Sequence, residues 1–271
     1  MREKLGDYTA SLRAYVREAR SFGDVVRLLR VRLSQSRVGP LVCRTPTTVT
    51  VDTEHLGLSV RLRSHTTDIV VFNEIIVGRS YEPLARAAGS SVSTLVDLGA
   101  CTGLASRWFL ERFPSACLVA VEPSPGNASV LRTNLRPYAA RARVVQACIG
   151  ATSRQVVLVG DREDGFRMRE PDGVEGDTDV VTMSRVFDEL GSYRIYVLKV
   201  DIEGAEQELF EACGEWIGRV GLVSVECHHP FTGEMLVGLL KRNGVRPRVL
   251  HVGTGGPQYE WVLVRIETEQ P

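Results

Sequence analysis

The residues that point most directly to chemistry lie where an apolar run is followed by a glycine-rich loop. The run at 94–98 contains Asp97, and Gly99, Ala100 and Gly103 come directly after it. Glycines at the end of a strand let a ligand approach the backbone, because no side chain blocks the way. The carboxylate of Asp97 would repel a pyrophosphate but attract a ligand that carries an ammonium group. S-adenosylmethionine has an ammonium, a carboxylate and a sulfonium but no phosphate, so the loop predicts a ligand of this kind.

A second acidic residue follows at the spacing expected for a ribose contact. The apolar run at 118–122 ends in Glu122, which lies 19 residues after Gly103. In a doubly wound sheet, a carboxylate at this position accepts hydrogen bonds from the ribose hydroxyls of an adenosine. The dinucleotide pattern G-x-G-x-x-G is missing, because Cys101 occupies the position of its second glycine. The next run, at 144–148, is expected to flank the adenine.

Several blocks of the sequence resemble the FkbM-type S-adenosylmethionine-dependent methyltransferases. They are Asp97–Gly103, Val121–Pro125 with Asn127 and Leu131, Leu198–Glu206, the upstream stretches 67–74 and 78–82, and Glu226 with His228. The block Leu-Lys-Val-Asp-Ile-Glu-Gly-Ala-Glu at 198–206 is the most specific of them. The resemblance spans residues 45–266 and implies S-adenosylmethionine as the methyl donor, with S-adenosylhomocysteine as the product. One departure is Cys101, where the family usually carries Asn.

The loop chemistry and the resemblance together assign a set of residues to the cofactor. These are Glu74, Asp97, Gly99, Ala100, Gly103, Glu122, Pro123, Asn127, Ala147, Cys148 and Asp201. The residues assigned to the acceptor are Asp68, Tyr81, Glu203 and His229.

Two further residues are candidates for catalysis. Methyl transfer from a sulfonium needs an aligned acceptor and, when the acceptor is a hydroxyl, a base that takes its proton. Open α/β sheets bind their ligands at the carboxyl ends of the strands. Asp201 directly follows the apolar run at 195–200, and His228 follows the run at 221–226. We therefore predict that Asp201 orients the acceptor or the cofactor, or serves as base. We predict His228 as the base in preference to His229, because the resemblance to the family includes His228.

Other interpretations stay open for the residues around these two. Glu203 is also expected to cap the start of a helix, where a carboxylate is favoured. Lys199 stands inside an apolar run, and because a buried ammonium is costly unless it is paired, it should contact Asp97 or Glu226. We assign no metal ligands, but one alternative set for a divalent metal consists of Asp201, Glu226 and His228.

The order of apolar runs predicts the fold class. From residue 94 on, β-branched runs of about five residues alternate with helical stretches of about 10–15, which is typical of βαβ units. The runs at 249–252 and 259–266 flank a glycine-rich turn and predict a hairpin. We therefore predict an α/β fold with a doubly wound, mostly parallel, seven-stranded Rossmann-like sheet. An antiparallel C-terminal hairpin and an N-terminal helical and β extension complete it.

The expected organisation has three segments. Residues 1–45 form an N-terminal helical arm, 46–90 a small β and helical lead-in packed on the core, and 91–271 the S-adenosylmethionine-binding methyltransferase core. Apolar residues recur at three- and four-residue steps over 5–33, which favours a homodimer through the N-terminal helix as one option. The acidic, glycine-containing stretch at 161–179 predicts an exposed and mobile loop.

Composition limits the partners. Lys and Arg number 33 and Asp and Glu also 33, so a globally electrostatic partner such as nucleic acid or an anionic membrane is disfavoured. No run approaches the ~18 apolar residues of a membrane span. The six cysteines form no C-x-x-C pair, which favours reduced thiols and a cytoplasmic location. The predicted partner is a small-molecule acceptor.

These observations favour O-methylation of a hydroxyl on a small molecule, such as a sugar or secondary metabolite, in natural-product biosynthesis. N- or carboxyl-methylation of a small molecule is the first alternative, since an amine needs less help from a base. A non-catalytic cofactor-binding module is the second, but the acidic and glycine positions are intact. A nucleic-acid methyltransferase would need a basic face and an N/D-P-P-Y-like element, and the sequence has neither.

Overall fold

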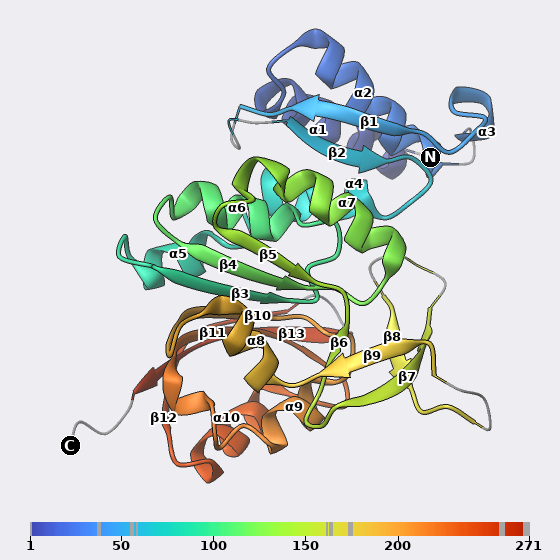
Figure 1. The fold of residues 1–271 in the computed structure, drawn as a ribbon. Coiled ribbons are helices and arrows are strands. Elements are labelled where there is room, and N and C mark those ends of the chain that lie inside the picture. Colours follow the sequence, from blue (N-terminus) through green and yellow to red (C-terminus); the bar gives the residue numbers. More distant parts are fainter. Residues whose placement is uncertain are drawn as a thin grey trace. The chain divides into compact units, whose positions relative to one another are not determined.

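The chain divides into two compact units. The computed structural model describes residues 2–36, 39–54, 57, 59–160, 162, 165–172, 176–254 and 258–267 (Figure 1). One unit comprises Met1–Tyr81 with Arg162–Asp164, and the other Glu82–Asp161 with Gly165–Pro271. The three segments expected from the sequence stay a prediction. Residues 1–45 and most of 46–90 belong to one unit, whereas residues 82–90 belong to the unit that holds the main sheet.

The N-terminal unit contains the expected helices and one antiparallel strand pair. Its elements are α1 (Arg2–Glu18), α2 (Phe22–Ser34), α3 (Gly39–Val42), β1 (Thr48–Asp52), β2 (Ser59–Arg63), α4 (Asp68–Phe72) and the π-helix η1 (Asn73–Val77). The hydroxyl of Ser21 caps α2 by accepting a hydrogen bond from the amide of Asp24 at 3.1 Å. Buried side chains from helices and strands, among them Tyr15, Leu28, Leu62 and Phe72, form its core.

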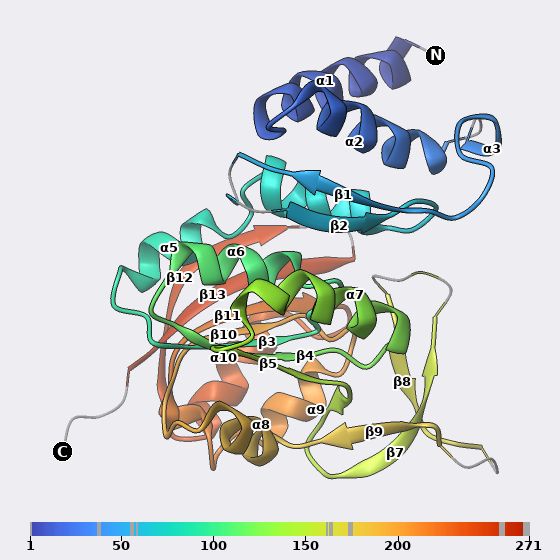
Figure 2. The same ribbon diagram turned by 45° about the horizontal axis from the view of Figure 1, so that its top comes forward.

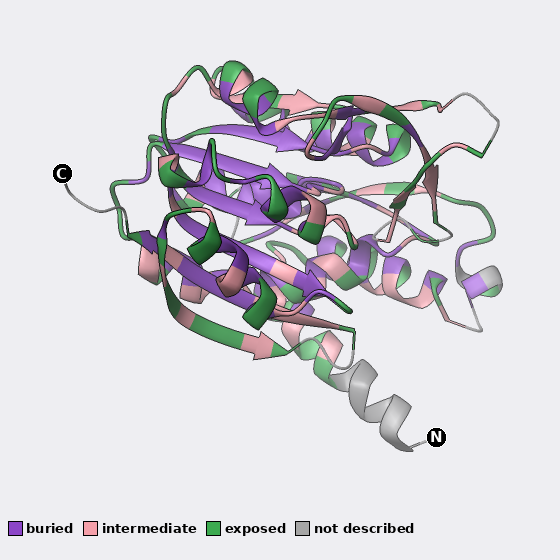
Figure 3. Cartoon of the chain, turned by 90° about the horizontal axis from the view of Figure 1, so that it is seen from below, coloured by how far each residue is buried: buried purple, intermediate pink, exposed green. Residues whose placement is uncertain are grey.

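The second unit is built on a seven-stranded sheet. Its strands are β3 (Thr94–Leu98), β4 (Cys117–Val121), β5 (Ala142–Val145), β10 (Ile195–Val200), β11 (Val220–His228), β12 (Arg246–Thr254) and β13 (Tyr259–Glu267). They are arranged in the order β12-β13-β11-β10-β3-β4-β5, and β13 is antiparallel to both neighbours. The central strands are almost wholly buried, as Figure 3 shows. The predicted doubly wound sheet with its C-terminal hairpin is confirmed.

Helices cover both faces of this sheet (Figures 1 and 2). One face carries α5 (Glu82–Ala88), α6 (Leu104–Arg112) and α7 (Pro125–Leu135), and the other α8 (Met183–Leu190), α9 (Glu206–Glu211) and α10 (Gly233–Arg242). The last three share one apolar core with the strands. Short 3₁₀ turns, η2 (Arg136–Tyr138) and η3 (Ile217–Arg219), follow α7 and precede β11. Among the described residues, none of the helices has the length and apolar character required to cross a membrane.

A second, smaller sheet lies between β5 and α8 in the sequence. It contains β6 (Cys148–Ile149), β7 (Arg154–Val159), β8 (Arg167–Arg169) and β9 (Thr178–Val181), in the order β6-β9-β7-β8. The sequence did not predict it. The segment 161–179, expected to be a loop, contains all of β8 and the first residues of β9. Residues 161, 163, 164 and 173–175 of that segment lie outside the described part, so its expected mobility stays a prediction.

The neighbouring strands β3 and β10 bring two backbone segments into very close contact at their carboxyl ends. Gly99 has φ = +76°, in the left-handed region, and a Cβ atom there would lie 1.7 Å from the carbonyl oxygen of Asp201. No residue with a side chain fits without a backbone shift.

We expect Gly99→Ala to lower the free energy of unfolding by more than roughly 1–2 kcal/mol, which is the cost of placing alanine in a left-handed conformation. Gly89→Ala is the matched control, because Gly89 has φ = +73° and nothing within 4 Å of its added Cβ. Urea unfolding of both variants measures the difference. An equal loss in the two variants would show that the close approach imposes no constraint.

Candidate active site

The glycine loop joins β3 to α6 and is held by hydrogen bonds that it donates to the end of β4. The amides of Gly99 and Ala100 both donate to the carbonyl oxygen of Val121 at 3.0 Å. Gly103 starts α6 with φ = +81°, and a Cβ atom there would lie 2.4 Å from the Leu131 side chain. Gly99 and Gly103 are therefore required by close packing within the domain, against the Asp201 backbone and against Leu131 of α7.

Asp97 lies beneath this loop and is completely buried. Its Oδ2 atom accepts a hydrogen bond of 2.6 Å from the Ser106 hydroxyl, and its Oδ1 atom lies 3.1 Å from Lys199 Nζ. Both carboxylate oxygens thus face partners inside the unit. A direct contact between Asp97 and a ligand ammonium stays a prediction, and the structure shows Asp97 supporting the loop from within.

Lys199 contacts several acceptors at once. It is 3% exposed, and its ammonium donates to the carbonyl oxygen of Gly99 at 2.7 Å. The same ammonium lies near Asp97 and 3.4 Å from Asp201 Oδ2. The expected pairing of this lysine with Asp97 is confirmed, and the partner register of β3 and β10, in which Lys199 lies opposite Asp97, explains it.

Glu122 follows β4 and is held by three donors. Its Oε2 atom accepts from the amide of Cys101 at 2.9 Å, and its Oε1 atom from the amide of Ser124 at 2.9 Å and from the Asn127 side chain at 3.2 Å. Burial raises the pKa of Glu122, while these hydrogen bonds and Lys199 act in the opposite direction. A carboxylate has about four acceptor sites, so it can still accept from ribose hydroxyls.

Cys148 lies at the start of β6, where the adenine is expected. Burial raises its pKa to about 12, and the charge of Glu122 adds to the effect. Its thiol is therefore neutral, and with buried Ala147 it offers an apolar surface to a flat ring. The glycine loop, the Glu122 carboxylate and this surface all fit an adenosyl ligand.

A cluster of titratable side chains lies at the ends of β10 and β11. Asp201, Glu203 and His228 each place one ligand atom within 4.8 Å of the others. His228 Nε2 lies 3.5 Å from Glu203 Oε2. Glu203 has φ = 54°, a strained conformation that is kept where the surroundings require it. The structure therefore brings together three of the predicted site residues, which we call the strand-end cluster.

Glu206 is the residue of this region that the sequence reasoning missed. It is completely buried, and its Oε1 atom lies 2.9 Å from His228 Nδ1. The same oxygen accepts from the amides of Ile202 and Gly204. In the sequence, Glu206 is only the last residue of the block at 198–206, and no role follows from that position. The available signal was its spacing, since it is the third acid in Asp-x-Glu-x-x-Glu.

The carboxylates determine the protonation of His228. Burial, the largest influence, lowers the pKa of His228, but the hydrogen bond and charge of Glu206 and the charges of Asp201 and Glu203 outweigh it. The pKa therefore lies above its ordinary value. With Nδ1 directed at Glu206, the Nε2 atom is the one presented to the strand-end cluster.

The profile of the Methyltransferase FkbM domain matches residues 97–247, which is more than half of the chain. The chain belongs to the FkbM methyltransferase family. The matched segment is an S-adenosylmethionine-dependent methyltransferase domain, and it contains the glycine loop, Glu122 and the strand-end cluster.

Solved structures are similar to this chain at low sequence identity, and the first of them, with a TM-score above 0.5, shares its fold. The METTL16 MTase domain is 16% identical, with a TM-score of 0.51 over 90% of this chain and 81% of that chain. An FkbM methyltransferase from Methylobacillus flagellatus KT is 19% identical, with a TM-score of 0.46, and the match covers 65% of this chain. It covers only 44% of that protein's length. No curated protein sequence matches the chain.

The roles of four other predicted residues are not tested by the geometry within the FkbM domain. Glu74, Asp68 and Tyr81 belong to the N-terminal unit, where the carboxylate of Asp68 accepts hydrogen bonds from the Arg63 side chain at 2.7 and 3.1 Å. His229 is exposed. The roles assigned to these four residues stay predictions.

Two sequence interpretations need correction. The alternative metal set contained Glu226, but the group that the structure brings together has Glu203 in its place. Glu203 also does not begin a helix, because α9 starts three residues later. Glu203 lies in the five-residue connection, 201–205, between β10 and α9, and its carboxylate faces His228 from there.

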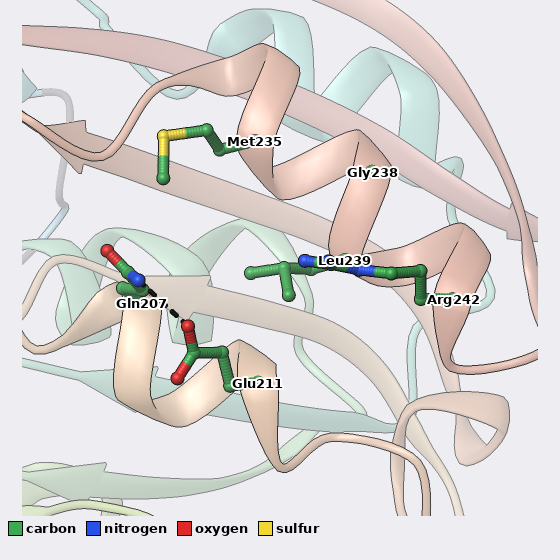
Figure 4. A pocket seen from close by; sticks show the side chains of 6 residues that line it. All are labelled: Gln207, Glu211, Met235, Gly238, Leu239 and Arg242. Carbon is green, nitrogen blue, oxygen red and sulfur yellow. Dashed lines mark hydrogen bonds between the residues drawn. The ribbon is translucent and has the colours of Figure 1, made fainter.

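A groove between α9 and α10 is separate from this site (Figure 4). It has a volume of about 420 Å³ and is lined by Gln207, Glu211, Met235, Gly238, Leu239 and Arg242. None of the strand-end cluster residues lines it. We therefore place the candidate active site at the strand ends and not in this groove.

Removing the Lys199 charge should destabilise the FkbM domain. We expect Lys199→Met to cost about 3–5 kcal/mol of unfolding free energy, because the buried Asp97 carboxylate loses its ion-pair partner. Adding Asp97→Asn should restore part of the loss. Lys241→Met, at an exposed position of α10, is the control and should change little. Urea unfolding that showed Lys199→Met as stable as this control would contradict the pairing.

Proposed function

We propose that this protein transfers the methyl group of S-adenosylmethionine to a hydroxyl of a small molecule, such as a sugar or secondary metabolite, in natural-product biosynthesis. The observation that carries the proposal is the position of the strand-end cluster. Asp201 follows β10, which pairs in parallel with β3, so the cluster and the glycine loop share one edge of the sheet. A donor over the loop and an acceptor over the cluster would be neighbours.

For the cofactor, we propose that Glu122 binds the ribose. The loop residues Gly99, Ala100 and Gly103 would lie under the methionine part, and Pro123, Asn127, Ala147 and Cys148 around the adenosine. Asn127 supports this role indirectly, since its side chain donates to the Glu122 carboxylate. When bound, S-adenosylmethionine supplies a methyl group that is already activated for displacement.

For the acceptor, we propose that His228 takes the proton of the hydroxyl. As the oxygen–carbon bond forms and the carbon–sulfur bond breaks, the electron pair goes to sulfur and the hydroxyl proton must leave. Nε2 of His228 is presented to the cluster and is oriented by Glu206 through Nδ1. Asp201 is one quarter exposed and lies between the loop and His228 along the sheet, so it can orient the acceptor.

If Glu122 binds the ribose, removing its carboxylate should weaken cofactor binding. Glu122→Ala should weaken S-adenosylhomocysteine binding by about 1–3 kcal/mol, the usual value for a hydrogen bond to a charged group. Isothermal titration calorimetry measures it, with Glu234→Ala on the exposed first turn of α10 as the control. Glu122→Gln, which keeps the shape of the side chain, separates lost affinity from lost folding. Unchanged affinity in both Glu122 variants would exclude the ribose role.

The acceptor assignment predicts that His228→Ala lowers turnover by roughly 10²–10⁴, the usual contribution of a positioned base. S-adenosylhomocysteine affinity should stay close to wild type. The assay measures transfer of a labelled methyl group to a panel of sugar and phenol acceptors. His229→Ala, at the exposed neighbouring position, is the control. Near-normal turnover of His228→Ala on a hydroxyl acceptor would contradict the assignment, and full activity on an amine would favour N-methylation.

A further inference from the structure

We propose that the strand-end cluster, Asp201, Glu203 and His228, binds a divalent cation of the Mg²⁺ or Mn²⁺ class. Binding of the cation depends on the three side chains alone. Only its effect on the acceptor rests on the proposed function. Two carboxylates and one imidazole form a mixed ligand set that suits such a cation and leaves coordination positions open.

The spacing of the ligand atoms fits one shared ion. One atom from each of the three side chains lies within 4.8 Å of the others. Ligands at about 2.1 Å from an octahedral ion lie roughly 3–4 Å apart, so only a small adjustment is needed. The ligands come from the ends of two neighbouring parallel strands, β10 and β11, whose pairing holds them in place.

Glu206 gives this site the outer contact that is typical of metal-bound histidines. Such histidines donate their second ring N–H to a carboxylate, which sets the tautomer and directs the other nitrogen to the metal. His228 Nδ1 lies 2.9 Å from Glu206 Oε1, and Nε2 faces Glu203. Glu206 is completely buried, and within the described residues its Oε2 atom has no hydrogen-bond partner.

The charges around the cluster favour an added cation. Oxygen atoms of Glu206 and Glu203 lie 2.9 and 3.5 Å from the two ring nitrogens of His228, and Asp201 belongs to the same group of side chains. The ammonium of Lys199, the cation that contacts Asp201, is shared with Asp97 and with the carbonyl oxygen of Gly99. A divalent cation would balance the remaining negative charge. Asp201 and Glu203 keep 27% and 22% of their side chains exposed, so the ion would also be open to an acceptor.

A cation at this position changes how the acceptor is activated. Coordination to a divalent metal lowers the pKa of a bound hydroxyl or water, so its proton passes to water more readily. His228 Nε2 would then act as a ligand. Its roles as ligand and as base exclude each other, and the following experiment distinguishes them.

The test is titration of chelator-treated protein with Mn²⁺, followed by electron paramagnetic resonance. We expect one site per chain. Asp201→Asn and Glu203→Gln should each weaken Mn²⁺ binding at least tenfold, and Glu206→Gln should weaken it by about 10–100-fold through the orientation of His228. Glu211→Gln, on the same helix as Glu206 but exposed, is the matched control and should bind as wild type. Thermal melting without Mn²⁺ shows that each variant is folded, and S-adenosylhomocysteine affinity without Mn²⁺ adds a second check for Glu203→Gln and Glu206→Gln.

Equal Mn²⁺ affinity in wild type and in folded Glu203→Gln would overturn the site. Turnover that persists unchanged in excess chelator would overturn the role of the cation in activating the acceptor, while leaving the proposed methyl transfer and the base role of His228 intact. Cation binding at the predicted residues, without methyl transfer to any acceptor, would support the site and contradict the proposed function instead.

Discussion

Lys199 carries a positive charge into the middle of the seven-stranded sheet, where its side chain is almost entirely shielded from water. An ammonium group in such a place is stable only when acceptors surround it, and here they are Asp97, the carbonyl oxygen of Gly99 and Asp201. Gly99 belongs to the loop proposed for the cofactor, and Asp201 to the cluster proposed for the acceptor. One buried charge therefore links the positions of both halves of the candidate active site.

A second buried contact, between Glu206 and His228, positions the side chain proposed to act on the acceptor. Glu206 is held by two backbone amides of the turn that follows β10, and it holds His228 at the end of β11. The imidazole is thus oriented by the first residue of α9 as well as by its own strand, β11. Sites built on strand ends are more precisely positioned than sites on free loops, because the pairing of the strands restricts them. Both candidate roles of His228, as base or as ligand, depend on this contact.

The topology of the sheet could be predicted from sequence because its signal is local. Each buried strand is a short run of β-branched residues, and the glycines after β3 mark the loop. The pairing of Lys199 with Asp97 could also be expected, since a buried ammonium needs a carboxylate. The contact of Glu206 with His228 could not, because it joins residues 22 positions apart and depends on where α9 begins. The small sheet was missed for a related reason. Its strands β6 and β8 have two and three residues, too few to show a period.

The central claim is that donor and acceptor meet at the carboxyl ends of β3, β4, β10 and β11. A crystal structure of the protein with S-adenosylhomocysteine tests it most directly. The account predicts ribose hydroxyls hydrogen-bonded to Glu122, the adenine beside Ala147 and Cys148, and the sulfur directed toward Asp201 and His228. A ligand bound away from Glu122, or with its sulfur directed away from the strand-end cluster, would contradict it.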